Sequence, residues 1–311
     1  MMTPSHRKIA DMNAKISKVF VPTARTQQVE SIFGELIAES RDRSGDHSSV
    51  LIVGPSQSGK TTSIVKATEK LESTLPGQVP ILHVTLPADV TRKSMIECIF
   101  TAAANRGFHN FNKLSGNEYR YQQRAFTLLE NLDTLLLILD ECHHIRGARD
   151  AVRAVQVGEL VKTFLIEGPC PLVLAGVGEA AKNPYQTNEQ LMLRSRPFVE
   201  LAPLQLTNPA DRALFGKMFT EFFDELERLQ IAENVREFQK AEFKSCLFQA
   251  ADGVVGQAIR LVREAFRQMI IAERAVLRIS DFETASDGIL LTSEKQRINH
   301  FSKLSASGFT Q

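Results

Sequence analysis

Hydrophobic positions divide the chain into a first part, in which short apolar runs alternate with helical stretches, and a second part that is helical throughout. Between residues 26 and 40, apolar side chains recur at the three- and four-residue spacing of an amphipathic helix. Five short apolar runs follow, separated by enough residues for crossover helices, at 50–53, 80–86, 135–139, 171–175 and 197–201. This alternation predicts an α/β fold with a five-stranded parallel sheet flanked by helices.

The pattern changes near residue 206, after which no strand-like run remains. The stretches 211–228, 240–250 and 256–278 read as helices, so we expect a sheet-containing core over 26–205 and a small all-helical domain over 206–292. Residues 1–25 are polar and rich in Lys and Arg, which suits either a basic arm or an ordinary solvated terminus. The polar, Ser-rich residues 293–311 predict a flexible tail.

A glycine-rich segment directly follows the first predicted strand. It reads GPSQSGKT and matches the P-loop pattern GxxxxGK[ST] in the strand-to-helix context that the pattern needs. Such a loop points backbone N–H groups at phosphate oxygens, while Lys60 reaches the β- and γ-phosphates and the Thr61 hydroxyl ligates Mg²⁺. The competing interpretation is a Gly/Ser-rich turn with an accidental lysine. The predicted ATP-binding residues are Gly54, Pro55, Ser56, Gln57, Ser58, Gly59, Lys60, Thr61 and Thr62.

Two adjacent acids, Asp140 and Glu141, end the third apolar run. Ligands of open α/β sheets bind at the carboxyl ends of the strands, so Asp140 is expected to hold Mg²⁺ and Glu141 to polarise the attacking water. The second acid favours ATP hydrolysis over a small-molecule kinase, because hydrolysis needs an activated water. Cys142, His143 and His144 follow at once, but no further His or Cys cluster completes a metal site. We interpret both histidines as part of the site wall or the start of a helix.

Arginines in two places have the positions expected of trans-acting or sensor residues. Arg194 and Arg196 precede the fifth apolar run, where one of them, preferably Arg196, could act as an arginine finger, or both could pair with Glu189 or Glu200. Arg260 opens a stripe on the predicted helix 256–278 whose later members are Arg263, Arg267, Arg274 and Arg278. Arg260 could reach the nucleotide as a sensor, or the stripe could be a solvated basic face.

Together these motifs resemble an AAA+ ATPase, and within that superfamily the TniB/TnsC-type transposition regulators. The resemblance rests on the P-loop, the LLLILDE strand end with its two histidines, the stretch 174–180, the Arg-Ser-Arg before the fifth strand and the GxxGxxxR sequence that starts at Gly253. It covers roughly residues 20–290. The end of the fourth strand, residues 175–179, lacks the Asn, Ser or Thr of a sensor-1 position, so that role stays unassigned and we expect slow hydrolysis.

The resemblance implies a regulator that assembles as a ring or filament on double-stranded DNA with ATP, links a target-selection protein to a transposase and releases on hydrolysis. In similar regulators the region between the second and third strands lines the ring interior, so its basic residues are expected to contact phosphates. These candidates are Arg92, Lys93, Arg106, Lys113, Arg120 and Arg124. A solvated helix face is the alternative for each of them. The alternative function is an AAA+ loader or remodelling ATPase that acts on a protein partner outside transposition.

Composition limits the compartment and the mode of DNA binding. The four cysteines, Cys98, Cys142, Cys170 and Cys246, have no disulfide or zinc spacing, and no apolar run approaches the ~20 residues of a membrane span, so we expect a cytoplasmic protein. The net charge is only +1, but bases gather at 1–25, 105–124 and 260–278 and are offset by acids at 221–227. A monomer is therefore expected to bind DNA weakly, and an oligomer more tightly.

Overall fold

A computed structural model describes residues 4–41, 47–109, 118–145, 151–186, 188–289 and 298–306 of the chain. The chain divides into two compact units. The first, here the core unit, comprises Ala24–Leu201. The second, here the helical unit, comprises Met1–Thr23 and Ala202–Gln311. The core-to-helical boundary lies close to the composition change near residue 206, but the first 23 residues belong to the helical unit.

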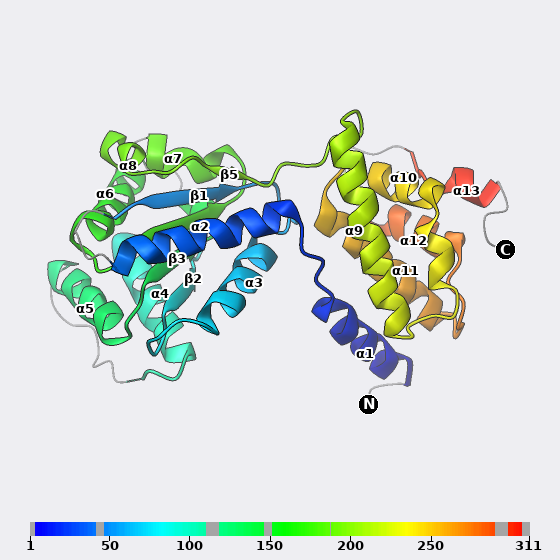
Figure 1. The fold of residues 1–311 in the computed structure, drawn as a ribbon, viewed down its shortest axis with the longest axis horizontal. Helices are drawn as coiled ribbons and strands as arrows, with labels where there is room; N and C mark the ends of the chain where they lie inside the picture. Colours follow the sequence, from blue (N-terminus) through cyan, green and yellow to red (C-terminus); the bar gives the residue numbers. More distant parts are fainter. Residues whose placement is uncertain are drawn as a thin grey trace. The chain divides into compact units, whose positions relative to one another are not determined.

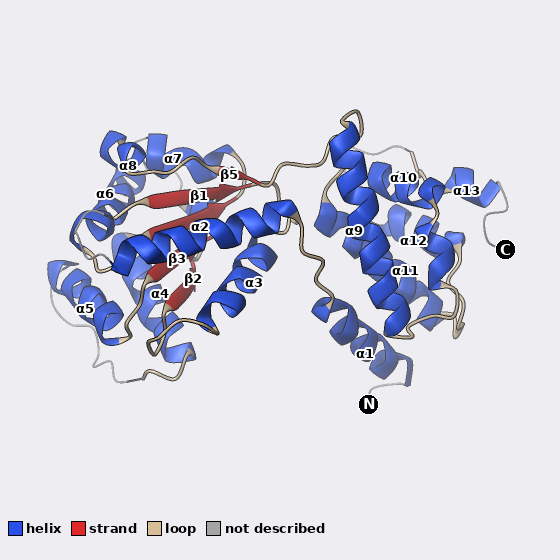
Figure 2. Cartoon of the chain, viewed as in Figure 1, coloured by secondary structure: helices blue, strands red, loops and turns tan. Residues whose placement is uncertain are grey.

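The core unit contains one parallel sheet in the order β2-β3-β4-β1-β5 (Figure 2). Its strands are β1 (Ser49–Val53), β2 (Ile81–Thr85), β3 (Leu136–Asp140), β4 (Leu172–Gly176) and β5 (Val199–Glu200). All five predicted apolar runs therefore form strands, and the predicted α/β fold is confirmed. They are mostly apolar because helices bury both faces of the sheet.

Successive residues of each strand enter opposite apolar layers. Helices of this unit pack on both faces of the sheet (Figure 1). Val50 and Ile52 pack with α2 and α3, while Leu51 and Val53 pack with residues of α4, α5 and α6. The helices of this unit are α2 (Ala24–Arg41), α3 (Lys60–Glu72), α4 (Arg92–Asn105), α5 (Glu118–Asn131), α6 (Ala151–Glu167), α7 (Asn183–Gln186) and α8 (Glu189–Leu193). Two 3₁₀ turns, η1 (Cys142–His144) and η2 (Glu179–Lys182), follow β3 and β4.

The helical unit has a core of its own that is dominated by phenylalanine. Its elements are α1 (Pro4–Lys18), α9 (Pro209–Arg228), η3 (Val235–Gln239), α10 (Ala241–Ala250), α11 (Val255–Ile271), α12 (Ile279–Ile289) and α13 (Ser302–Ala306). Phe219, Phe238, Phe243 and Phe282 are fully buried and stack edge-on or tilted on neighbouring rings. The helices of this unit therefore pack around a cluster of aromatic rings, whereas the helices of the core unit pack on a sheet.

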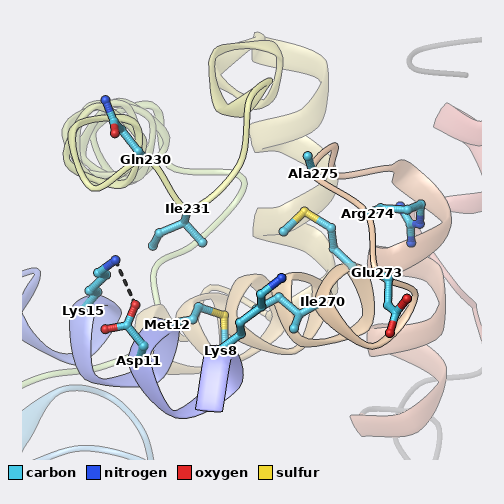
Figure 3. A pocket seen from close by; sticks show the side chains of 11 residues that line it. Lys8, Asp11, Met12, Lys15, Gln230, Ile231, Ile270, Glu273, Arg274 and Ala275 are labelled. Carbon is cyan, nitrogen blue, oxygen red and sulfur yellow. Dashed lines mark ion pairs between the residues drawn. The ribbon is translucent and has the colours of Figure 1, made fainter. Parts of the chain in front are cut away.

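The N-terminal segment is neither a free basic arm nor a solvated terminus. Met12 and Ile16 of α1 are 3% and 1% exposed and belong to the core of the helical unit, where α1 packs on α11. The segment carries an apolar stripe with a spacing of three or four residues, formed by Ile9, Met12, Ile16 and Val19. The many polar residues around this stripe made it hard to recognise from composition. Figure 3 shows α1 contributing one wall of a pocket, with the ion pair between Lys15 and Asp11 at its edge.

The prediction that one long helix over 256–278 carries a stripe of five arginines is also wrong. α11 ends at Ile271, because Glu273 adopts a left-handed conformation (φ 54°) and the amide of Arg274 turns back to donate to the carbonyl of Met269. Arg274 pairs instead with Asp281 of α12. The helix therefore keeps only the first three arginines of the predicted stripe, at 260, 263 and 267.

Part of the expected flexible tail is packed. Phe301 is fully buried and Leu304 nearly so in the core of the helical unit, and the Asn299 amide donates to the backbone carbonyl of Glu283. The remaining tail residues, 293–297 and 307–311, lie outside the described part of the chain. Over the described ranges, no helix combines the length and hydropathy that crossing a bilayer requires.

Burial of α1 predicts that Ile16→Ala destabilises the chain by about 2–5 kcal/mol, the usual loss for a large apolar side chain removed from a core. Urea unfolding followed by circular dichroism measures the change. Lys8→Ala is the matched control on the same helix, because Lys8 is exposed. Equal unfolding midpoints for the two variants would show that α1 does not contribute to the core.

Candidate functional site

The P-loop connects β1 to α3 at the carboxyl edge of the sheet. A Cβ on Gly54 would lie 2.6 Å from the backbone carbonyl oxygen of Leu201, so only glycine fits where the loop leaves the strand. Gly59 has φ 91° and forms the N-cap of α3 without a side-chain cap. The first N–H groups of α3 are therefore left for another acceptor, which is the local geometry of an anion site.

Lys60 is 7% exposed and folds back over the loop. Its ammonium group donates to the carbonyls of Gly54 at 3.0 Å and Pro55 at 2.8 Å. Burial lowers the pKa of Lys60, and the carboxylates of Asp140 and Glu141 oppose that shift. The charge is thus held at the centre of the loop by weak, neutral acceptors that a phosphate can replace.

The loop is tied to the end of β3 by a hydrogen bond between side chains 79 positions apart. The Thr61 hydroxyl donates to Asp140 Oδ2 at 3.0 Å. Asp140 is 2% exposed, whereas Thr61 is exposed. Two oxygen groups at one edge of the sheet, one of them a carboxylate, are the donor set that Mg²⁺ prefers.

Asp140 is held in its ionised form by its neighbours. Burial alone would raise the pKa of its carboxyl group, but the His83 ring, the Glu141 amide and the Thr61 hydroxyl outweigh burial and lower it. The Glu141 amide donates to Oδ1 at 2.8 Å, and His83 Nε2 lies 3.4 Å from Oδ2. A group with a lowered pKa stabilises the fold above its unfolded-state pKa and loses that contribution as the pH falls through its folded-state pKa.

The turn after Asp140 carries residues whose contacts the sequence did not reveal. Glu141 has φ 61°, and its Oε2 lies 3.1 Å from His143 Nδ1. His144 Nδ1 lies 3.1 Å from the Leu86 carbonyl oxygen. The turn also groups three possible metal-ligand atoms within 4.8 Å of one another, one each from Glu141, His143 and His144. We did not expect this grouping from the spacing of these residues.

The loop contains a polar atom that suits a bound phosphate. Among the described residues, Ser58 Oγ is one of the buried side-chain oxygens without a hydrogen-bond partner. Such an atom is costly unless something else satisfies it. With the uncapped start of α3 and the Lys60 ammonium group, it forms a cradle that fits an anionic phosphate. The other loop residues predicted to bind ATP, Pro55, Ser56, Gln57 and Thr62, lie in the same loop or in the first turn of α3.

The two candidate fingers lie at the other end of β1. The carbonyl of Arg194 accepts from the Ser49 amide, and the amide of Arg196 donates to the Ser49 carbonyl. Ser49 begins the strand whose far end leads into the P-loop, roughly 13 Å away at ~3.3 Å per residue. Neither arginine can reach the P-loop of its own chain, so a role for them in hydrolysis requires a second subunit.

Arg196 has partners that the sequence did not indicate. Its guanidinium bridges Glu35 at 2.5 Å and Glu39 at 2.9 Å, both on α2, rather than pairing with Glu189 or Glu200. Arg194 is half-buried and donates to the Gln190 carbonyl at 3.5 Å. Arg260 is exposed on α11, in the other unit, so its contact with a nucleotide stays a prediction.

The structure separates the DNA-binding candidates into two groups. Arg92 and Lys93 begin α4, and Lys93 Nζ lies 5.7 Å from the ring centre of Tyr121 on α5, beside Arg120. Arg106 caps the other end of α4, about 20 Å along the helix, and pairs with Glu72 at 2.9 Å. Arg124 lies on α5, one turn after Arg120. Lys113 lies outside the described residues.

A model of the family described as "Bacterial TniB protein" matches residues 12–202. No curated protein matches the sequence. Solved structures share the fold over most of the chain. Cdc6p from Pyrobaculum aerophilum has a TM-score of 0.59 at 13% identity, over 89% of this chain and 71% of that chain.

Two proteins of Aeropyrum pernix are similar to the same extent. ORC2, solved as ADPNP-ADP complexes, has a TM-score of 0.63 at 11% identity, over 90% of this chain and 72% of that chain. ORC1, solved in complex with DNA, has a TM-score of 0.60 at 17% identity, over 87% and 66% of the two chains. Identities this low show the fold alone, which is that of AAA+ proteins.

The close approach at Gly54 predicts that Gly54→Ala destabilises the chain by about 1–3 kcal/mol, because a backbone carbonyl must move to admit the methyl group. Gly34→Ala is the matched control, since a Cβ at this position of α2 has no atom within 4 Å and should stabilise the helix by about 0.5–1 kcal/mol. Chemical denaturation measures both changes. Two substitutions with the same sign and size would contradict the packing described at Gly54.

Proposed function

The chain belongs to the TniB family of bacterial proteins, a family of transposition-associated AAA+ ATPases, and from this premise we propose that it is an ATP-dependent regulator of DNA transposition. It binds ATP in the P-loop, oligomerises as a ring or filament on double-stranded target DNA, and disassembles when ATP is hydrolysed. In the oligomer it bridges a target-selection protein and a transposase.

One observation carries the ATPase part of this proposal. Lys60 and Thr61 come from one segment and Asp140 from another, 79 positions from Thr61, and all three lie at one edge of the sheet. Lys60 donates to two carbonyls of its own loop at 2.8 and 3.0 Å, and Thr61 donates to Asp140 at 3.0 Å. A Gly/Ser-rich turn with an accidental lysine would not place that lysine beneath the loop or the following threonine on a buried carboxylate. Their convergence supports a site for a nucleotide and its cation.

The residues divide the chemistry among them. Lys60 leaves the carbonyls of Gly54 and Pro55 for phosphate oxygens, because a charged acceptor makes a stronger hydrogen bond than a neutral carbonyl. Thr61 and Asp140 hold Mg²⁺, which neutralises charge on the β- and γ-phosphates when bound. Glu141 accepts a hydrogen bond from the water that attacks the γ-phosphate and orients it. ATP and water give ADP and phosphate.

A second subunit completes the site in this proposal. Arg196 lies too far from its own P-loop to act there, and its guanidinium stabilises the γ-phosphate charge of a neighbouring subunit. To do so it must exchange Glu35 and Glu39 for phosphate, so hydrolysis is slow until subunits assemble. Arg194, close to it along the same edge, is the second candidate for this role.

DNA binding is assigned to the starts of α4 and α5. Arg92, Lys93, Arg120 and Arg124 contact phosphates, which fixes the position of the protein without reading sequence. Arg106 lies at the other end of α4, apart from these four residues, and is therefore the weakest of the candidates in the described part of the chain. ORC1, which shares this fold, was solved in complex with DNA, and this supports an AAA+ core as a DNA-binding scaffold.

We predict that Glu141→Gln lowers kcat for ATP hydrolysis by about 10²–10⁴-fold, because it removes the general base but keeps the side-chain volume. ATP affinity should be unchanged. Lys60→Ala should lose affinity for a fluorescent ATP analogue measured by titration. Hydrolysis at the wild-type rate by Glu141→Gln would exclude Glu141 as the base, and unchanged affinity in Lys60→Ala would exclude the P-loop as the site.

A further prediction concerns DNA. The double substitution Arg120→Ala, Arg124→Ala should weaken ATP-dependent binding to a DNA duplex. It should also make the salt dependence of binding less steep, by about one unit of slope for each phosphate that the protein no longer neutralises. Arg106→Ala is the control and should leave the slope unchanged. Fluorescence anisotropy at several salt concentrations gives the slope.

The same assay separates the proposal from its alternative. Binding that is equally tight without ATP would contradict assembly on DNA. Binding of ATP-loaded chain to a protein partner but to no duplex would favour a loader or remodelling ATPase.

A further inference from the structure

The His143 ring lies between the carboxylate of Glu141 and the end of β4. Nδ1 is 3.1 Å from Glu141 Oε2, and the Val177 amide donates to the same nitrogen at 3.4 Å. Val177 directly follows Gly176, the last residue of β4. One ring nitrogen therefore contacts both the proposed general base and the backbone of the neighbouring strand end.

The position of this ring is fixed by the packing of η1. Cys142 is fully buried, and its Sγ lies 3.7 Å from the Ala181 carbonyl oxygen. A Cβ on Gly176 would lie 2.8 Å from that sulfur and 3.0 Å from the His143 amide nitrogen, so the turn sits directly on a glycine. The His144 ring packs 4.4 Å from the His143 ring. The turn cannot shift without disturbing these contacts.

A single ring nitrogen cannot serve both of its neighbours at once. A protonated Nδ1 donates to the Glu141 carboxylate, whereas an unprotonated Nδ1 accepts from the Val177 amide. The two hydrogen bonds therefore exclude each other, although both partners lie within reach. Only a protonated Nδ1 holds the Glu141 carboxylate, whereas an unprotonated Nδ1 ties the ring to the end of β4 instead.

The Glu141 carboxylate is only partly restrained by its own surroundings. Its backbone is in the left-handed region, and its side chain is about one-third exposed, so few contacts restrict its rotamers. The end of β4 offers no polar side chain over residues 175–178, which read Ala-Gly-Val-Gly. His143 is the side chain near this strand end that contacts the carboxylate.

We propose that His143 is a positioning residue for Glu141: it holds the carboxylate in line for the attacking water when Nδ1 donates to it, and releases it when Nδ1 accepts from the Val177 amide at the end of β4. This inference rests on the proposed function, since it concerns the same ATPase site. It assigns no contact between His143 and the substrate. Its signature is a change in turnover without a change in nucleotide affinity.

The test compares His143→Leu with His143→Asn in Mg²⁺-dependent ATP hydrolysis by the full chain. Leu removes both hydrogen-bonding capacities, and kcat should fall about 10- to 100-fold, the loss that accompanies a misplaced catalytic group. The Asn amide lies near the position of Nδ1 and both donates and accepts, so it should restore most of the turnover. Affinity for a fluorescent ATP analogue should stay within about twofold of wild type in both variants, which corresponds to ~0.4 kcal/mol.

His144→Phe is the control from the same turn, because it keeps a ring packed on His143 and removes only the contact of Nδ1 with the Leu86 carbonyl oxygen, not a contact with the Glu141 carboxylate. Its turnover per folded molecule should stay near wild type, with thermal unfolding used to correct for stability. Wild-type kcat in His143→Leu, or equal losses of kcat and affinity in the Leu and Asn variants, would overturn the inference. If the wild-type chain hydrolyses no ATP under any condition, the proposed function itself fails and the inference with it.

Discussion

The hydrogen bond from Thr61 to Asp140 joins the two halves of the site, and the arrangement around it follows from the order of the sheet. β1, which leads into the P-loop, and β3, which ends at Asp140, are not neighbours, because β4 lies between them. The bond therefore joins two strand ends that flank the end of β4. At that end, Gly176 leaves room for the turn that follows Asp140, since a side chain there would collide with Cys142 and Ala181.

Burial affects both charged groups of the site, the Lys60 ammonium group and the Asp140 carboxylate. Lys60 and Asp140 are both nearly inaccessible, and burial acts against the charged form of each. Asp140 accepts hydrogen bonds from the Thr61 hydroxyl and the Glu141 amide and has the His83 ring beside it, whereas the nearest hydrogen-bond acceptors of Lys60 are two neutral carbonyls. The ammonium group is therefore the less satisfied partner, and an anion that enters the loop improves its environment most. The loop is thus arranged so that a phosphate can bind beside Lys60 without a large rearrangement of the residues around it.

The sequence predicted the parts of this structure that depend on local pattern. The five strands were recognisable because apolar residues dominate each run, most completely in β1, β3 and β4, which are buried on both faces, and the P-loop because its glycines have geometric roles. Contacts that depend on strand register were missed. His83 pairs with Ile138 across β2 and β3, which places it on the same face as Asp140, but nothing in the β2 sequence indicates this pairing. The end of α11 was missed because Glu273, not glycine, takes the left-handed position. α1 was misjudged because its charged residues outnumber its apolar stripe.

The central claim is that Lys60, Thr61 and Asp140 exchange their present partners for a nucleotide and its cation. A structure of the chain determined with a non-hydrolysable ATP analogue and Mg²⁺ tests this claim most directly. The account predicts that Lys60 Nζ leaves the carbonyls of Gly54 and Pro55 for phosphate oxygens, and that the Thr61 hydroxyl turns from Asp140 to the metal ion. A nucleotide bound elsewhere, or a bound nucleotide with Lys60 still on both carbonyls, would contradict it.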